Sequence, residues 1–313
     1  MTTIESITPL AASPIAPALT APAWVSALVG KATRIFRTET GVEVSVATSA
    51  NATMVTAIAC KARVSNGEAF RDRAIDVYRA VRQAIDQSAA KTGTANIVRI
   101  WNHIPGIHDP LDAECDRYMH FNAGRFAAMC EWFGGADRIP ELVPAASGVG
   151  HEGLDLIVRA LATTERGTPV ENPRQIPAFR YSKRYGPIPP CFARATRITN
   201  PRPVLLLAGT AAITGEASQY MGDLQRQLEL TLENLRILIR SGAPEMSAAI
   251  DPLRQIDHAR VYLARSNDIA AMQSQLQDRF GAAKENVEFI RADLCRADLL
   301  VEIEGVASLE TVV

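Results

Sequence analysis

Two similar stretches, DLIVRALATT at residues 155–164 and DLLVEIEGVA at residues 298–307, decide the fold of this chain. Each is typical of the last β-strand in one half of the sequence. A second similar pair, ANIVRIWNH at residues 95–103 and DHARVYLAR at residues 257–265, follows the first long helix expected in each half. The repeated order indicates that one α+β module occurs twice, although short apolar strands can also resemble each other by chance.

The segments around these stretches supply the other elements of the two modules. In the first half, strands are expected at residues 42–46, 52–62, 96–104 and 154–161, and helices at residues 71–87 and 112–133. In the second half, strands are expected at residues 204–213, 259–264, 287–292 and 299–306, and helices at residues 219–240 and 268–280. Each module should therefore be a sheet with two helices on one face.

Four segments divide the chain. Residues 1–25 are rich in Ala, Pro and Thr and lack the charged and unbroken apolar regions of a signal peptide, so they are expected to form a loose arm. The modules are expected at residues 26–165 and 204–313. Between them, residues 166–203 are rich in Pro, Arg and Tyr, and the prolines prevent a regular helix. We expect this segment to be a connector that contributes to the site.

The composition excludes several classes of function. Among 313 residues, 33 Lys and Arg stand against 34 Asp and Glu, so no overall positive field is available for nucleic acid or an anionic membrane. No apolar run is long enough to cross a bilayer. The cysteines and histidines lack the spacings of disulfide frameworks or metal sites, and no nucleotide-binding glycine motif occurs. We therefore expect a cytoplasmic protein without a metal or cofactor.

The two last strands differ at one position that bears on function. When they are aligned, Arg159 of the first strand lies opposite Glu302 of the second. Because a guanidinium cannot replace a carboxyl group in acid–base chemistry, the two modules are not equivalent. Only the second module is expected to carry a carboxylate-dependent site.

The end of the chain resembles the last strand of the YjgF/RidA family, which carries the pattern VEIE with a catalytic glutamate first. Four further segments resemble the chorismatases, two-module relatives of that fold: RYMHFNAGR at 117–125, RYGPIPPCFARAT at 184–196, LLLAGTAAITGE at 205–216 and VYLARSND at 261–268. The resemblance implies two YjgF/RidA-like (chorismate-mutase-like) modules, each a mixed sheet with helices packed on one face. It also implies an enzyme that splits chorismate into pyruvate and a ring product.

The same resemblance implies roles for two residues of the second module. It places the proton donor at Glu302, which would protonate the methylene carbon of the enolpyruvyl ether after burial has raised its pKa. The alternative is that Glu302 and Glu304 share an exposed strand face. Cys295, seven residues earlier, corresponds to a cysteine that participates in catalysis in chorismatases that form 3-hydroxybenzoate. Its presence favours aromatisation, whereas the alternative is a small buried thiol.

A second marker of the product type indicates the opposite outcome. In the LLLAGT segment, the small residue that lines the ring pocket is expected to be Ala208, and the resemblance implies alanine for hydrolytic members and glycine for 3-hydroxybenzoate formers. The leading product is 3-hydroxybenzoate, alone or alongside 4-hydroxybenzoate, and the alternatives are 4-hydroxybenzoate alone or 3,4-dihydroxycyclohexa-1,5-diene carboxylate. Gly209 beside it is expected to allow close backbone approach or a tight bend.

Chorismate carries two carboxylates, so a chain of net charge −1 must gather local cations for it. Arginine is suited to this because its planar fork pairs with a carboxylate in two hydrogen bonds. The resemblance and the Arg-rich connector together predict these substrate-binding residues: Arg125, Arg194, Arg180, Arg184, Arg265, Tyr118 and Tyr185. Each arginine has the alternative of a solvated or ion-paired surface residue, and each tyrosine that of a packing residue.

The leading interpretation is a cofactor-independent chorismatase that binds neither nucleic acid nor membrane and is a monomer or trimer. One alternative is a RidA-like deaminase of enamines and imines, which would use the same strand glutamate. It is disfavoured because that family consists of single modules that form trimers. The other alternative is a small-molecule-binding protein of the same fold without catalytic activity.

Overall fold

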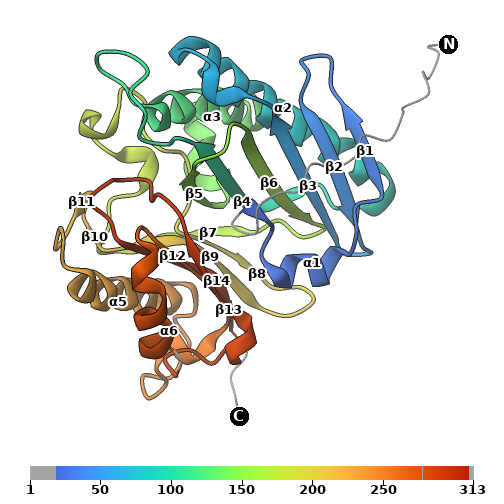
Figure 1. Ribbon diagram of the computed structural model, residues 1–313. Coiled ribbons are helices and arrows are strands. Elements are labelled where there is room, and N and C mark those ends of the chain that lie inside the picture. Colours follow the sequence, from blue (N-terminus) through green and yellow to red (C-terminus); the bar gives the residue numbers. More distant parts are fainter. Residues whose placement is uncertain (1–18, 277, 310–313) are drawn as a thin grey trace.

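The computed structural model of the protein describes residues 19–276 and 278–309 and contains two six-stranded sheets (Figure 1). The first sheet has the order β1-β2-β3-β6-β4-β5, from β1 (Arg34–Arg37), β2 (Glu43–Thr48), β3 (Ala52–Ala59), β4 (Asn96–Pro105), β5 (Ala145–His151) and β6 (Leu156–Thr163). The second has the order β7-β8-β9-β14-β12-β13, from β7 (Thr168–Val170), β8 (Ala195–Ile198), β9 (Val204–Ala211), β12 (Ile256–Leu263), β13 (Val287–Arg291) and β14 (Val301–Ser308).

The two sheets share one topology. In each, the sixth strand of the module lies between the third and the fourth, and only the fourth and fifth run parallel, namely β4 with β5 and β12 with β13. The helices occupy the same places in both halves: α2 (Gly67–Thr92) and α3 (Arg117–Phe133) in the first, α5 (Leu224–Gly242) and α6 (Ile269–Leu276) in the second. The prediction of two α+β modules, each a mixed sheet with helices on one face, is confirmed.

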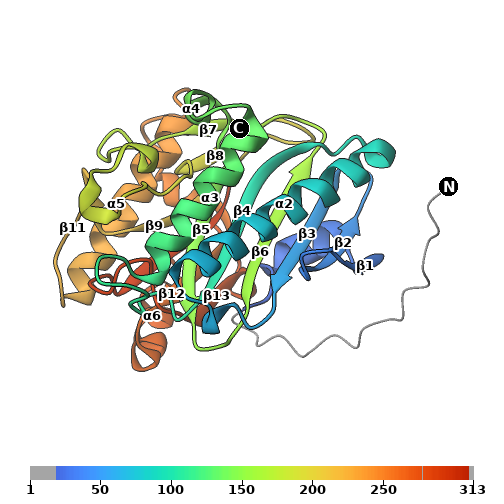
Figure 2. The same ribbon diagram turned by 90° about the horizontal axis from the view of Figure 1, so that it is seen from above.

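The sheets pack against each other through the faces that carry no long helix. Figure 1 shows α2 and α3 on one outer side and α5 and α6 on the other, and Figure 2 shows α2 and α3 lying across the strands of the first sheet. Buried side chains from both sheets meet in between, among them Trp101 and Leu161 of the first and Leu206 and Val306 of the second. The strands β4, β6 and β14 are consequently buried on both faces.

Cross-strand register corrects one of the sequence alignments. Arg159 on β6 pairs with Trp101 on β4, and Glu302 on β14 pairs with Tyr262 on β12. Arg159 and Glu302 are therefore equivalent, as predicted, but Trp101 corresponds to Tyr262 and not to Leu263. The register shifts between Ile97 and Arg99 on β4, and between Ile256 and His258 on β12. Because these shifts lie at different points along the two strands, the apolar pattern of β4 is displaced by one residue relative to that of β12.

The bounds of several elements differ from those expected. α3 begins at Arg117 and not at residue 112, because the Asp116 side chain caps it and accepts a hydrogen bond from the Met119 N–H at 2.8 Å. Asp112 instead closes a preceding turn, where its Oδ1 accepts from the Cys115 N–H at 2.7 Å. The strand β5 was not expected, because its sequence AASGVGH is too rich in small residues to show an alternating pattern.

Parts of the expected arm and connector belong to the folded units. β7 and β8 lie within residues 166–203 and pair in the second sheet, so that sheet starts before residue 204. In the expected arm, residues 1–18 lie outside the described residues, while the helix α1 (Ala23–Val29) buries Val25 and Val29 in the core between the sheets. The remaining short α-helix and β-strands among the described residues are α4 (Ile139–Leu142), β10 (Ile213–Thr214) and β11 (Ala217–Ser218). Among the described residues, no helix is long and apolar enough to cross a membrane.

Candidate active site

A cavity of about 420 Å³ lies where the two modules and the connector meet. The first module contributes residues from the loop after β4 and from the start of α3, the connector contributes aromatic and basic residues, and the second module contributes β9, β14 and the segment before β14. The lining residues are His108, Asp116, Tyr118, Met119, Tyr181, Arg184, Tyr185, Pro190, Phe192, Arg194, Gly209, Ala211, Ile213, Cys295, Arg296, Ala297, Asp298 and Glu302. A volume of this size accommodates a small organic acid.

Glu302 is the buried carboxyl group of this cavity. It lies on the second strand position of β14, and only 3% of the residue is exposed. Burial raises its pKa to about 8, and the nearby charge of Glu304 contributes, while Arg99 and Arg194 oppose the shift. The side chain therefore retains its proton at neutral pH and can act as a general acid.

Gly209 on β9 makes room for that carboxyl group. A Cβ added at this position would lie 1.9 Å from Glu302 Oε1 and 2.6 Å from its Cδ. Any other residue would thus displace the acid. The expectation that Gly209 permits close approach holds here, although the group that approaches is a side chain of the protein. Gly209 and not Ala208 lines the cavity, so the pocket-lining role predicted for Ala208 is corrected to its neighbour.

Glu304, two residues after the acid, is held by a buried network that spans both sheets. Its Oε1 accepts hydrogen bonds from Trp101 Nε1 at 2.9 Å and Tyr262 Oη at 3.2 Å. Its Oε2 accepts from Arg99 Nη2 at 2.8 Å and from the Ser147 hydroxyl. Both glutamates are at most 3% exposed, so the alternative of an exposed strand face is wrong. Only Glu302 faces the cavity.

Cys295 lines the cavity close to Glu302. Burial is the main cause that raises the pKa of its thiol to about 12, and the Glu302 carboxyl group adds to the shift. The side chain is therefore a protonated thiol at neutral pH and not a thiolate. It can donate or accept a weak hydrogen bond at the substrate, but it is a poor nucleophile in this state.

Three arginines line the cavity, and two of them were predicted. Arg194 is buried, donates from Nη2 to Tyr181 Oη at 2.5 Å, and has no hydrogen-bond partner at Nε among the described residues. Arg184 lies on the exposed rim. The third, Arg296, was missed by the sequence reasoning, although it directly follows Cys295; its guanidinium stacks 3.8 Å from the centre of the Tyr185 ring.

Three other predicted arginines do not reach the cavity. Arg125 is buried behind its wall, donates to Asn122 Oδ1 at 2.7 Å and lies near the ring of Phe192. It can support the wall but cannot touch a substrate in this arrangement. Arg180 and Arg265 are exposed and do not line the cavity. The prediction that Arg125, Arg180 and Arg265 bind the substrate directly is therefore corrected.

The predicted tyrosines both line the cavity. Tyr118 comes from the first turn of α3, and Tyr185 from the connector, where its ring centre lies 5.4 Å from that of Tyr181. Tyr181 was not predicted. It comes from the same connector segment as Tyr185 and is the hydrogen-bond partner of Arg194. Tyr181 could have been included among the predicted residues because residues 166–203 are rich in aromatic and basic residues.

In the turn before α3 and in its first turns, Asp112, Cys115 and His120 are of the residue types that bind metals and lie close together. Their contacts are explained without an ion. Asp112 Oδ2 lies 2.6 Å from His120 Nε2, while its Oδ1 caps the turn through the N–H of Cys115. We assign no metal to this group.

Comparison with known proteins gives concordant results. The family description "Chorismatase FkbO/Hyg5-like, N-terminal" matches residues 33–162. A 3-hydroxybenzoate synthase of Streptomyces hygroscopicus is 34% identical over 222 residues, which are 68% of this chain but only 64% of that protein. A chorismatase of Streptomyces rapamycinicus is 32% identical over 257 residues, 79% of this chain and 73% of that protein. A crystal structure of a chorismatase superposes with a TM-score of 0.72 and 27% identity, covering 89% of this chain and 80% of that one.

Proposed function

This chain belongs to the chorismatase family, and from that premise we propose that it cleaves chorismate to pyruvate and 3-hydroxybenzoate, with 4-hydroxybenzoate as the second aromatic product to be sought. The observation that carries the proposal is the buried carboxyl group of Glu302, whose pKa burial raises, in a cavity that also holds Arg194, Arg184 and Arg296. Protonation of the enol ether requires an acid, and binding of the two carboxylates of chorismate requires cations.

The first chemical step is assigned to Glu302. Its proton goes to the methylene carbon of the enolpyruvyl group, which becomes an oxocarbenium ion. The carboxylate that remains stabilises this cation at short range in a poorly solvated site. Water that adds to the cationic carbon gives a hemiketal, whose collapse releases pyruvate and the dihydroxy acid. To form a hydroxybenzoate the ring must in addition lose a hydroxyl group and a proton, so overall no water is consumed.

The basic residues of the cavity are assigned to the two carboxylates of chorismate. Arg194 is the most buried of them, and its Nε has no hydrogen-bond partner among the described residues. Arg184 and Arg296 both lie against the ring of Tyr185, with their guanidinium carbons 5.6 Å and 3.8 Å from the ring centre. The hydroxyl groups of Tyr118 and Tyr185 can add hydrogen bonds. We further propose that the enzyme is cytoplasmic and acts without a cofactor.

Two features support aromatisation over simple hydrolysis. Cys295, the marker expected for 3-hydroxybenzoate formation, lines the cavity beside the acid. A relative that is 34% identical over 222 residues is named a 3-hydroxybenzoate synthase, which supports the same product. The other marker, Ala208, is of the type implied for hydrolytic members, but it is not among the residues that line the cavity.

The basic test is to mix the purified protein with chorismate and to follow pyruvate with lactate dehydrogenase, with the ring products separated by HPLC. Pyruvate together with 3-hydroxybenzoate is the expected result. Pyruvate with only the dihydroxy acid would assign the hydrolytic reaction. Thermal stabilisation by chorismate without pyruvate would indicate a binding protein, and ammonia release from enamines without action on chorismate would indicate a deaminase.

The pH dependence of the reaction should follow the acid form of Glu302. Because the carboxyl group must carry a proton to react, kcat/KM is expected to be constant near neutral pH and to fall about tenfold per pH unit above a pKa of about 8. Measurement of initial rates of pyruvate release between pH 6 and pH 10 checks this. A rate that stays level to pH 10 would show that another group supplies the proton.

Replacement of Cys295 by alanine should change the products more than the rate. The thiol does not supply the first proton, so pyruvate release is expected to persist within about tenfold of the parent rate. The share of the dihydroxy acid should rise at the expense of 3-hydroxybenzoate, as HPLC would measure. Cys60→Ala, which changes a cysteine outside the cavity, is the matched control. An unchanged product profile would show that Cys295 has only a packing role.

A further inference from the structure

The segment that leads from β13 to Cys295 rests on the first module, although it belongs to the second. The Gly150 N–H at the end of β5 donates to the Asp293 carbonyl oxygen at 2.6 Å, an isolated bridge between the modules. The next residue, Leu294, accepts a hydrogen bond at its carbonyl oxygen from His108 Nε2 at 2.8 Å. Two consecutive peptide groups before the thiol are therefore bound by residues of the other module.

Only glycine fits at the first of these contacts. A Cβ added at Gly150 would lie 2.4 Å from Ile107 Cγ2 and 2.9 Å from Asp293 Cβ. The close approach of the two backbones is therefore built into the sequence at this position. It brings the loop after β4, which carries His108, alongside the segment that carries Cys295.

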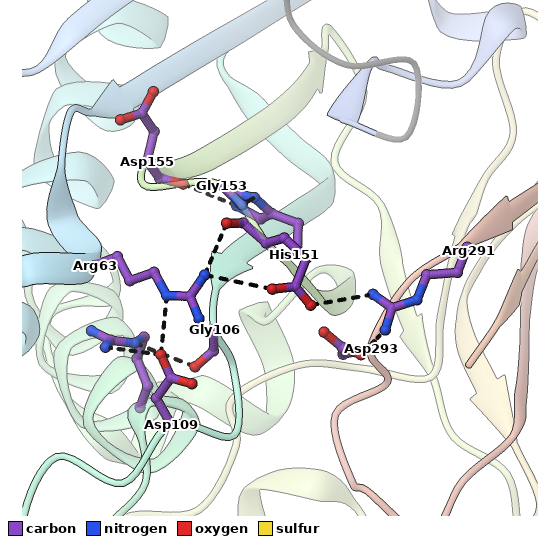
Figure 3. Close-up of polar contacts among 10 residues, drawn as sticks. Arg63, Gly106, Asp109, His151, Gly153, Asp155, Arg291 and Asp293 are labelled. Atoms are coloured by element: carbon purple, nitrogen blue, oxygen red, sulfur yellow. Dashed lines mark hydrogen bonds and ion pairs between the residues drawn. The ribbon is translucent and has the colours of Figure 1, made fainter. Parts of the chain in front are cut away.

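Ion pairs reinforce the same junction on its solvent side. Arg291 at the end of β13 pairs with Asp293 at 2.7 Å and lies 3.8 Å from Glu152, in the turn between β5 and β6. Arg63 of the first module approaches the same Glu152 at 3.7 Å and pairs with Asp109 at 3.1 Å. Figure 3 shows these two arginines on opposite sides of the turn, with Asp109 and Asp293 beside them. These pairs are partly solvent-exposed, so each adds little to stability.

His108 joins this junction to the cavity. It lines the cavity and also holds the Leu294 carbonyl group. The carbonyl oxygen of Leu294 lies in one peptide plane with the nitrogen and Cα of Cys295. A hydrogen bond to that oxygen therefore restricts the rotation that would move the thiol toward or away from the substrate.

We infer that His108 is a positioning residue, which acts through the Leu294 peptide to place the Cys295 thiol and thereby sets the proportion of aromatic acid to dihydroxy acid that the enzyme releases. The inference rests on the proposed function of this site. The first module carries Arg159 where the second carries Glu302. According to this inference, the first module nevertheless takes part in the choice of product.

The test compares products of the full-length protein with chorismate. His108→Phe keeps the ring shape but cannot donate a hydrogen bond, and it should raise the ratio of dihydroxy acid to 3-hydroxybenzoate about fivefold, the effect of losing one neutral hydrogen bond. His108→Gln retains a donor at a similar reach and should keep the ratio within about twofold of the parent. The ratio is independent of the fraction of protein that is folded. His108→Asn, whose amide is too short to reach the carbonyl oxygen, replaces the Phe variant if that variant is insoluble.

Two controls separate a positioning role from other effects. In a Cys295→Ala background, His108→Phe should no longer alter the ratio, because its effect passes through the thiol. His120→Gln, a substitution of a histidine outside the cavity, should leave the ratio unchanged. An unaltered ratio in soluble His108→Phe or His108→Asn, or a full effect in the absence of Cys295, would overturn the inference. Absence of pyruvate from the parent protein would instead refute the proposed function.

Discussion

Glu302→Gln is expected to reduce pyruvate release from chorismate by about 10³-fold, because general acid catalysis by a positioned carboxyl group contributes about 10²- to 10⁴-fold. Glutamine has the same shape and fits beside Gly209, but it has no acidic proton to give to the methylene carbon. Binding of chorismate, measured by titration calorimetry, should persist. Retained turnover would show that the acid lies elsewhere.

Stability measurements separate this loss of activity from a loss of fold. Burial holds the pKa of Glu302 at about 8, above the usual value of 4.5. The native state therefore binds the proton more tightly than the unfolded chain, and the stability that this provides falls as the pH rises from about 4.5 and is lost above about 8. Glutamine cannot ionise. The melting temperature of the variant at pH 9 should consequently equal or exceed that of the parent.

Gly209→Ala is expected to lower kcat by about 10²-fold, the cost of displacing a catalytic group by about 1 Å. The added methyl carbon would lie 1.9 Å from Glu302 Oε1, so the carboxyl group must turn away from its place in the cavity. Steady-state kinetics on the purified variant would measure the effect. Chorismate binding should fall less than kcat, because the arginines that hold the carboxylates are not displaced.

The matched control for this substitution is Gly148→Ala on β5. A Cβ at Gly148 would meet Tyr118 at 3.6 Å, which is an ordinary van der Waals contact. The variant should retain parental kcat within about twofold, as expected for a substitution that creates no clash. If Gly209→Ala were as active as Gly148→Ala, the close approach of Gly209 to the acid would have no part in catalysis.

The sequence was most informative where a pattern is local. The period-two alternation of β14 and its likeness to β6 predicted the repeated module and the exchange of Arg159 for Glu302, and the register of both sheets bears this out. The long helices were also expected, because their apolar spacing is unambiguous. By contrast, β5 has no such pattern. It was found only in the structure, where it pairs in parallel with β4.

The candidate site was harder to predict, because which side chains meet depends on how the two sheets pack. Arg125 lies in a distinctive motif, yet it faces Asn122 behind the cavity wall. Arg296 has no motif of its own but reaches the cavity. Ser147, which binds both Glu304 and the Gly209 N–H, comes from a strand that was not expected at all. Contacts of this kind join residues far apart in the chain and leave no local signal.

The contrast between the two sheets has a consequence for the history of the protein. Arg159 occupies the place of Glu302 in the first sheet, where it is 3% exposed and its Nη1 lies 3.3 Å from His103 Nδ1. Exchange of Arg159 for glutamate would put a carboxyl group into this buried site, away from the cavity and its arginines, because neither Arg159 nor His103 lines the cavity. A single exchange at this position would therefore not give the first module a reactive centre of its own, so the divergence of the two copies is not undone by one substitution.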